Sequence, residues 1–179
     1  MGNRKTTNHN HRIIAIDPGT REMGVVVVQG REILYYGVKS FKRRNPASVL
    51  LAQIGNAVEK LLHAYQPDVL VIEKAQLNKH NATRKLIQIS KMIKFVAKQQ
   101  RLKIVEYSSE SVRKRVCKVE RPTKNNMTNE LCSKYPELSV YRYRKHEWKS
   151  KYWQNMFDAL GLAVAYLDSK AVKLNIDQE

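Results

Sequence analysis

Apolar residues in this chain follow two kinds of pattern, short runs and longer stretches with helical spacing. Short apolar or alternating runs between turn residues are typical of β-strands. They predict strands at residues 13–17, 24–29, 32–41, 68–73 and 102–108. Apolar residues three or four positions apart predict helices at residues 47–65, 82–100, 127–134 and 153–169. Strands that alternate with helices in this order predict an α/β fold, with one mixed central β-sheet flanked by α-helices.

The remaining segments lack a clear period. Residues 111–126 are basic and weakly patterned, and residues 136–152 look irregular, so neither is assigned an element at this stage. Residues 1–11 are predicted to form a disordered basic and polar arm, residues 12–169 a single domain, and residues 170–179 a C-terminal tail. A domain of this length can bury a hydrophobic core without disulfides or structural metals.

Composition adds a strong bias in charge. The 33 Lys and Arg residues outnumber the 16 Asp and Glu residues, which gives a net charge of +17, while the hydrophobic fraction of 42% is ordinary. Such a charge favours a polyanionic partner, and nucleic acid is the usual one for a domain of this kind. No apolar stretch approaches the roughly 18 residues of a membrane span, so no membrane partner is expected. The two cysteines lack the spacing of a zinc site and predict free thiols in a reducing intracellular compartment that contains DNA.

Three acidic residues stand in apolar surroundings. Asp17 ends the first predicted strand, Glu73 ends the strand at residues 68–73, and Asp158 interrupts the last helix. Asp17 alone could simply start the Pro-Gly turn that follows it. The carboxyl ends of parallel strands gather at one edge of a sheet, however, and carboxylates that converge there repel unless a hard cation such as Mg²⁺ or Mn²⁺ binds them. An acidic metal site within a basic protein predicts a nuclease or a phosphoryl transferase.

The residues around these acids carry a family resemblance. The stretch IIAIDPGTREMG resembles the opening of the RuvC-type Holliday-junction resolvases, which belong to the ribonuclease H-like superfamily. Residues 68–116, the stretch TKNNM and the stretch NMFDALGLAVAY resemble later segments of that family in the same order, so the likeness spans residues 12–167. It implies a ribonuclease H-like fold. It also implies a Mg²⁺-dependent endonuclease that resolves four-way DNA junctions by paired symmetric nicks as a homodimer.

The resemblance also implies roles for individual residues. Asp17 would bridge two Mg²⁺ ions, for which Mn²⁺ can substitute, while Glu73 would complete one site and Asp158 the other. The family's fourth ligand is Asp or His, but this chain has Asn155 there, whose amide oxygen can bind a cation without contributing charge. Replacing Asn155 by Asp is therefore expected to tighten metal binding, unless Asn155 only hydrogen-bonds a neighbour. Lys124 falls on the family's active-site lysine and is expected to stabilise charge on the scissile phosphate.

Further positions are expected to contact DNA or a second subunit. Arg113 falls on a DNA-contacting lysine of the family, and it begins a basic stretch that includes Lys114, Lys118 and Arg121. Gln76 falls where bacterial members often carry an aromatic wedge near the junction centre. In the family, the helix predicted at residues 82–100 lies at the dimer interface; the alternative is that its apolar residues pack on the sheet.

Two other functions remain open from the sequence. The chain could be a ribonuclease H-like nuclease that acts on RNA, on an RNA–DNA hybrid or on other branched DNA. It could also be a nucleic-acid-binding protein whose catalysis is impaired by Asn155. The three acids favour an enzyme, because binding alone does not require carboxylates in apolar surroundings.

Overall fold

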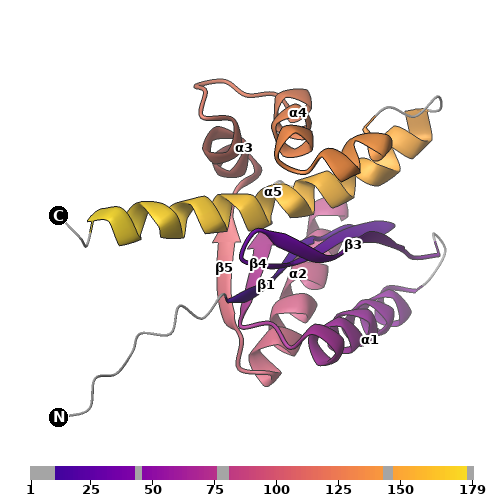
Figure 1. Cartoon of the computed structure of the whole chain (residues 1–179). Helices are drawn as coiled ribbons and strands as arrows, with labels where there is room; N and C mark the ends of the chain where they lie inside the picture. The colour runs from indigo at the N-terminus through magenta and orange to yellow at the C-terminus, as the bar shows by residue number, and fades with distance from the viewer. Residues whose placement is uncertain (1–10, 43–45, 76–80, 143–146, 177–179) are drawn as a thin grey trace, which may run out of the picture.

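A five-stranded mixed sheet forms the centre of the molecule (Figure 1). The computed structural model describes residues 11–42, 46–75, 81–142 and 147–176. The strands follow the order β3-β2-β1-β4-β5, where β1 pairs antiparallel with β2 and parallel with β4. Their bounds are β1 Arg12–Asp17, β2 Glu22–Gln29, β3 Glu32–Ser40, β4 Val69–Glu73 and β5 Lys103–Tyr107.

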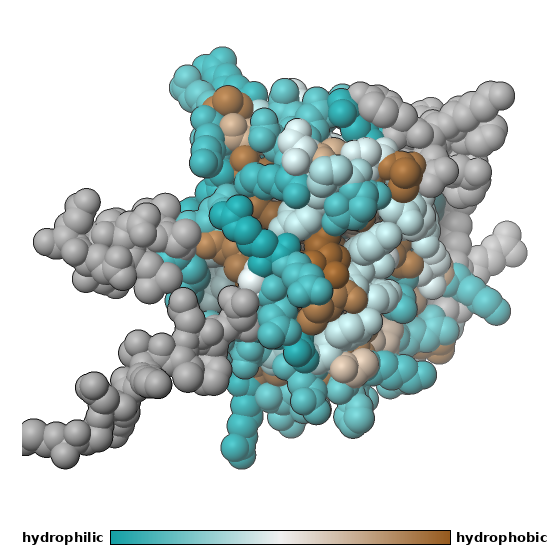
Figure 2. All heavy atoms as spheres, in the orientation of Figure 1, coloured by the Kyte–Doolittle hydropathy of each residue, from teal (hydrophilic) through white to brown (hydrophobic). Residues whose placement is uncertain are grey.

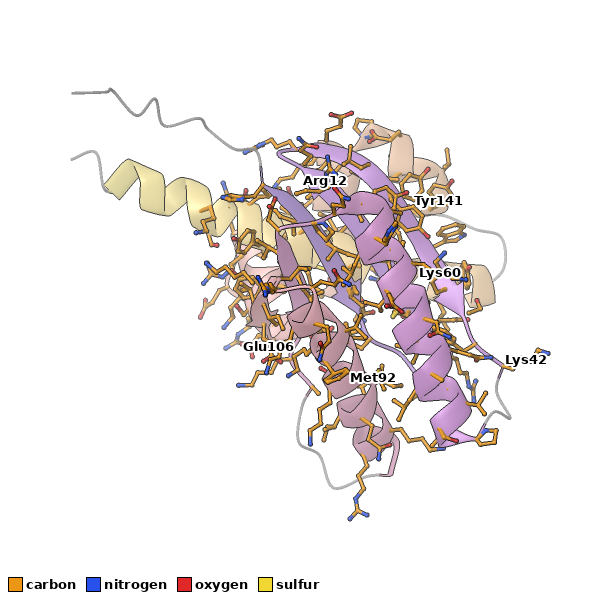
Figure 3. All side chains as sticks on the ribbon, turned by 90° about the horizontal axis from the view of Figure 1, so that it is seen from below. Arg12, Lys42, Lys60, Met92, Glu106 and Tyr141 are labelled. Carbon is orange, nitrogen blue, oxygen red and sulfur yellow. The ribbon has the colours of Figure 1, made fainter. Side chains whose placement is uncertain are left out.

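Helices cover both faces of the sheet. Helices α1 (Ala47–Tyr65) and α2 (Asn81–Gln99) lie side by side across one face, as Figure 3 shows from below. The opposite face is covered by α5 (Glu147–Ile176), which packs against four of the strands, with α3 (Ser109–Cys117) and α4 (Lys124–Lys134) beside it. Among the described residues, no helix is long and apolar enough to cross a membrane.

The alternation of side chains along the strands creates two hydrophobic cores. On β1, Ile13 and Ala15 point to the α5 side, while Ile14 and Ile16 point to the side of α1 and α2. All four side chains are at most 1% exposed. The two cores pack helices against both faces of the sheet. The surface drawn in Figure 2 is mostly hydrophilic, and its hydrophobic residues form several separate groups.

The sequence predicted the periodic elements well and the basic ones poorly. The predicted strands, the helix at residues 47–65 and the helix at residues 82–100 are confirmed to within a few residues. Helix α3 was not predicted, because only Val112 and Val116 of its nine residues are buried and most of the others are charged or polar. The segment expected to be irregular contains the 3₁₀ helix η1 (Pro136–Tyr141) and the first turns of α5, and α4 begins three residues earlier than expected. Helix α5 continues to Ile176, past the predicted domain end at residue 169.

Helix α2 uses its apolar stripe mainly to pack on the sheet. Ile89 and Ile93 are at most 1% exposed within the core that α1 shares, so for these residues the packing alternative is confirmed. Phe95 points away from that core and is 57% exposed.

Strand β2 and helix α5 approach each other unusually closely at Gly24. A Cβ atom at this position would lie 1.8 Å from the backbone oxygen of Asn155, so only glycine fits. Gly24 also pairs with Asp17 across β1 and β2. The contact therefore joins three elements that meet at one edge of the sheet.

Candidate active site

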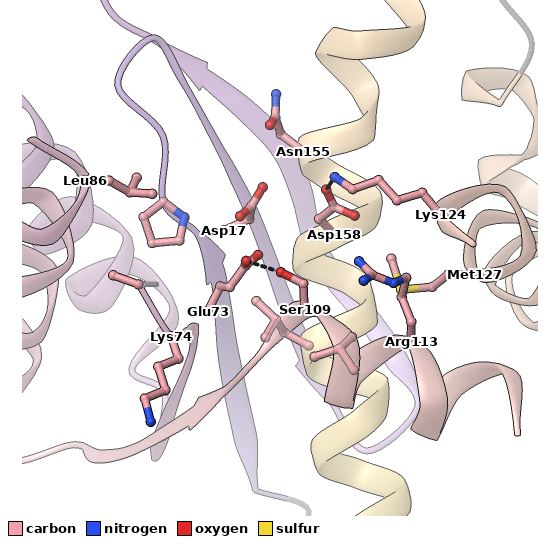
Figure 4. A pocket seen from close by; sticks show the side chains of 14 residues that line it. Asp17, Glu73, Lys74, Leu86, Ser109, Arg113, Lys124, Met127, Asn155 and Asp158 are labelled. Carbon is pink, nitrogen blue, oxygen red and sulfur yellow. Dashed lines mark hydrogen bonds and ion pairs between the residues drawn. The ribbon is translucent and has the colours of Figure 1, made fainter. Parts of the chain in front are cut away.

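The acidic residues singled out in the sequence line one pocket of about 370 Å³ at the carboxyl ends of β1 and β4 (Figure 4). The parallel pairing of these strands sets Ile16 beside Ile72, so the next residues, Asp17 and Glu73, emerge at the same edge. Helix α5 crosses this edge and adds Asn155 and Asp158. Their spacing of three residues places both on one side of the helix.

Negative charge is concentrated around Asp17. Burial raises the pKa of the Asp17 carboxyl well above its ordinary value, and the nearby carboxylates of Asp158 and Glu73 raise it further, against a smaller opposing effect of Lys124. Taking a carboxylate out of water and placing others beside it is costly unless a cation compensates. The site is therefore built to attract positive charge.

The two flanking acids are each held by a neighbouring side chain. Ser109 at the start of α3 donates a hydrogen bond from its hydroxyl to the carboxylate of Glu73. Asp158, whose side chain is 12% exposed, forms an ion pair of 2.7 Å with Lys124 at the start of α4 and accepts a hydrogen bond of 3.0 Å from Gln154. Burial alone would lower the pKa of Lys124, but the Asp158 carboxylate, with Asp17 and Glu73, raises it overall, so this lysine is charged.

Asn155 lines the pocket, and the nitrogen of its side-chain amide is hydrogen-bonded to neighbouring residues. Its Nδ2 donates a hydrogen bond of 3.1 Å to Oε2 of Glu22 and one of 3.2 Å to the backbone oxygen of Tyr152. Figure 4 shows the nitrogen directed away from the acids and the amide oxygen on the side of Asp17 and Asp158.

The donor set fits a hard divalent cation. Three carboxylates and one amide oxygen supply oxygen ligands only, which is the preference of Mg²⁺ and Mn²⁺. Within the described part of the chain, no three Asp, Glu, His or Cys side chains surround a single point as a closed metal site would. Figure 4 shows Asp17 beside both Glu73 and Asp158, and the charges of both acids act on its carboxyl. The pocket therefore gathers the oxygen donors that a divalent cation would need.

The basic residues expected to contact DNA separate into two groups. Arg113 lines the same pocket as the acids. Lys114 lies elsewhere on α3 and pairs with Glu110 at 2.7 Å, while Lys118 and Arg121 are exposed in the connection between α3 and α4. Gln76, the residue at the expected wedge position, lies outside the described residues.

Three contributors to the site were missed in the sequence. Ser109 comes two residues after the end of β5, and β5 lies beside β4, so its place after a parallel strand is a usable signal. Gly24 follows the first turn, and the sequence indicates only that it belongs to a strand. Glu22 gave no signal, because its partner Asn155 lies 133 residues away in the chain.

The fold is of the ribonuclease H-like class. The structure is similar to that of Thermus thermophilus RuvC, with a TM-score of 0.74 at 16% identity over 90% of this chain and 96% of that one. It is also similar to the yeast mitochondrial Holliday junction resolvase Ydc2, with a TM-score of 0.67 at 15% identity over 93% of this chain and 82% of that one. The predicted fold class is confirmed.

Sequence comparison gives the family. The family model described as crossover junction endodeoxyribonuclease RuvC matches residues 13–132, and the chain belongs to this family of enzymes. RuvC of Thermomicrobium roseum is 27% identical over 168 residues, which cover 91% of this chain and 97% of the relative. RuvC of Chelativorans sp. is 30% identical over 110 residues, which cover 59% of this chain and 64% of the relative. The resemblance seen in the sequence is thereby confirmed.

Proposed function

We propose that this protein is a Mg²⁺-dependent endonuclease that resolves four-way DNA junctions by paired, symmetric nicks as a homodimer. The observation that carries this proposal is the convergence of Asp17, Glu73 and Asp158 in one pocket beside a charged lysine. Membership of the RuvC family and the net charge of +17 support a DNA substrate. Thermus thermophilus RuvC, a structurally similar protein, is described in complex with a Holliday junction substrate.

In this proposal the acids bind divalent cations and the surrounding residues set their positions. Two ions would be held by these residues, with Asp17 at both binding sites, Glu73 at one, and Asp158 with the amide oxygen of Asn155 at the other. The cations would supply an activated water for attack on phosphorus and stabilise the leaving oxygen. Ser109 restricts the orientation of the Glu73 carboxylate through its hydrogen bond.

Lys124 acts on the phosphate in this proposal. Its ammonium is 2.7 Å from Oδ2 of Asp158 and its side chain remains 55% exposed, so it can also reach an anion that enters the pocket. A positive charge held at this point stabilises the charge that develops on the phosphate oxygens in the transition state. We therefore assign Lys124 to catalysis rather than to general DNA affinity.

Basic residues near the pocket hold the DNA backbone. Arg113 forms part of the pocket wall, which supports its role in contacting the phosphates of a bound strand. Lys118 and Arg121 extend this positive surface along the connection between α3 and α4. Lys114 also belongs to it, although its ammonium forms an ion pair with Glu110. Such contacts position the substrate without reading its sequence.

A homodimer would match the symmetry of the substrate. A four-way junction has two-fold symmetry, so two identical subunits related by a two-fold axis would present one active site to each of two equivalent strands. Helix α2 is the surface we assign to this contact, since Phe95 is 57% exposed on it while Ile89 and Ile93 face the core.

A cleavage assay on three substrates tests the proposal. The purified protein is incubated with Mg²⁺ and a synthetic four-way junction, a plain duplex or an RNA–DNA hybrid of the same sequence. We expect symmetric nicks in the junction, little cleavage of the others, and no cleavage when the metal is chelated. Cleavage of the hybrid in preference to the junction would assign the protein to a different ribonuclease H-like activity. Binding without cleavage under all metal conditions would identify it as a binding protein.

A further inference from the structure

Glu22, the first residue of β2, holds the amide of Asn155. The Nδ2 atom of Asn155 lies 3.1 Å from Oε2 of Glu22, and both residues are partly buried. Asn155 lines the acidic pocket, whereas Glu22 is not among the residues that line it. The carboxylate of Glu22 is thus one hydrogen bond away from a residue that faces the cation site.

The orientation of the Asn155 amide follows from its partners. Besides Glu22, the nitrogen end faces the backbone oxygens of Tyr152 at 3.2 Å and Lys151 at 3.5 Å. All three partners are acceptors, so the NH₂ group must point to them, because an oxygen there would face three other oxygens. The amide oxygen is consequently left on the side of Asp17 and Asp158, as Figure 4 shows.

We propose that Glu22 is a positioning residue for the metal site, which rests on the proposed function of this pocket in binding divalent cations. Glu22 fixes the Asn155 amide with its oxygen toward the cation. It also supplies, one hydrogen bond behind the ligand, the negative charge that a neutral amide lacks. A carboxylate behind a ligand polarises that ligand and makes it a better donor. The pair Glu22 and Asn155 then acts as one charged ligand divided between two residues.

This assignment changes the expected effect of Asn155→Asp. In the wild-type background, a carboxylate at this position would stand about 3 Å from the Glu22 carboxylate, with no proton donor between them. Repulsion would turn the new side chain away, so the added charge would not tighten metal binding. If Glu22→Gln is made at the same time, the Gln amide can donate to the new carboxylate. The hydrogen bond is then restored with its direction reversed.

The test measures metal affinity directly, without DNA. Mn²⁺ is titrated into the protein, and the free ion is followed by electron paramagnetic resonance, for wild type, E22Q, N155D and E22Q/N155D. We expect E22Q to weaken Mn²⁺ binding about 10-fold. We expect N155D to bind Mn²⁺ more weakly than wild type, because the repelled side chain no longer faces the cation, and E22Q/N155D to recover wild-type affinity within about threefold. Glu59→Gln, which removes an exposed carboxylate on α1 across the sheet, is the matched control and should change nothing.

A second measurement uses the nicking reaction. The Mg²⁺ concentration for half-maximal rate should rise in E22Q and return in the double variant, while the rate at saturating Mg²⁺ stays within about threefold. If Glu22 only stabilised the fold, E22Q would lower the melting temperature and the maximal rate, and adding N155D would restore neither of them.

The outcomes separate this inference from the proposed function. If Asp158→Asn binds Mn²⁺ as well as wild type does, the pocket is not a cation site and the proposed function fails with the inference. If Asp158→Asn weakens binding but E22Q does not, only the role of Glu22 is wrong. The role of Glu22 would also be wrong if the losses of Mn²⁺ affinity in E22Q and N155D added up in E22Q/N155D. Should E22Q alone not fold, the comparison of N155D with the double variant still decides, because the proposal requires the double variant to bind more tightly.

Discussion

Replacing Gly24 by alanine should disturb the active site from outside the pocket. Gly24 lies opposite Asp17 in the β1–β2 pairing and directly under the backbone of α5 at Asn155. The added Cβ would lie 1.8 Å from the Asn155 backbone oxygen and 2.3 Å from its carbonyl carbon. These atoms belong to a helical backbone and not to a flexible side chain, so they cannot rotate away.

The expected loss of stability follows from how far α5 must move away from β2 to make room for the added Cβ atom. An ordinary carbon–oxygen contact requires about 3.4 Å, so α5 and β2 must separate by about 1.5 Å. Overpacking of this kind costs about 1–3 kcal/mol, and the upper end applies because a backbone has to move. For a domain of this size, about 3 kcal/mol corresponds to a fall of roughly 6–12 °C in melting temperature. The same movement shifts Asn155 and Asp158 relative to Asp17, and a displacement of about 1 Å costs on the order of 100-fold in rate.

The assay pairs thermal denaturation with single-turnover nicking of a bound junction well below the melting temperature. Gly55→Ala in α1 is the control, because its Cβ would meet the Met92 sulfur at 3.4 Å, an ordinary contact. Alanine is the better helix former, so this control should keep full nicking activity and gain up to about 1 kcal/mol in stability. A Gly24→Ala variant that melts and nicks as wild type does would refute the reasoning. A less stable variant with full activity would show that the contact supports the fold and does not set the positions of the acids.

Three further predictions concern the pocket and its basic surroundings. Asp17→Asn should abolish nicking while junction binding stays equal or tightens, because a negative charge near phosphates is removed; nicking at the wild-type rate would exclude Asp17 as a metal ligand. Arg113→Ala and Lys118→Ala should each reduce the slope of log affinity against log salt concentration by about one, and unchanged slopes in both would place the DNA elsewhere. Lys124→Ala should lower the single-turnover rate with little change in the junction dissociation constant. Weaker binding at an unchanged rate would make Lys124 an ordinary backbone contact.

Sequence patterns predicted those parts of the fold whose burial is periodic. Strands β1 and β4 are continuously apolar and buried, and α1 is bounded by Pro46 and Pro67, so their positions could be predicted closely. The acids at the ends of the two strands converge because parallel pairing leaves no other arrangement. Helix α3 could not be predicted because only two of its side chains, Val112 and Val116, are buried. Two apolar positions among charged and polar residues are too few to show a helical period.

The contacts that orient the site could not be predicted in the same way. Glu22 meets Asn155 only because α5 crosses β2 at Gly24, and the angle of that crossing is set by packing over the whole sheet. The ion pair between Lys124 and Asp158 likewise depends on where α4 docks on α5. Residue type and spacing therefore identify the acids, whereas their partners require the tertiary structure.

The place of α5 in the chain has a consequence for protein synthesis. Asp17 and Glu73 are made early, but Asn155 and Asp158 come on the helix that also covers a whole face of the sheet. Until that helix has left the ribosome, the growing chain has half of its acidic site and an uncovered apolar face, which is a target for chaperones. Completion of the site and burial of that face are then the same event. A copy that stops before α5 lacks half of the acidic pocket and leaves that apolar face exposed, which makes it prone to aggregate.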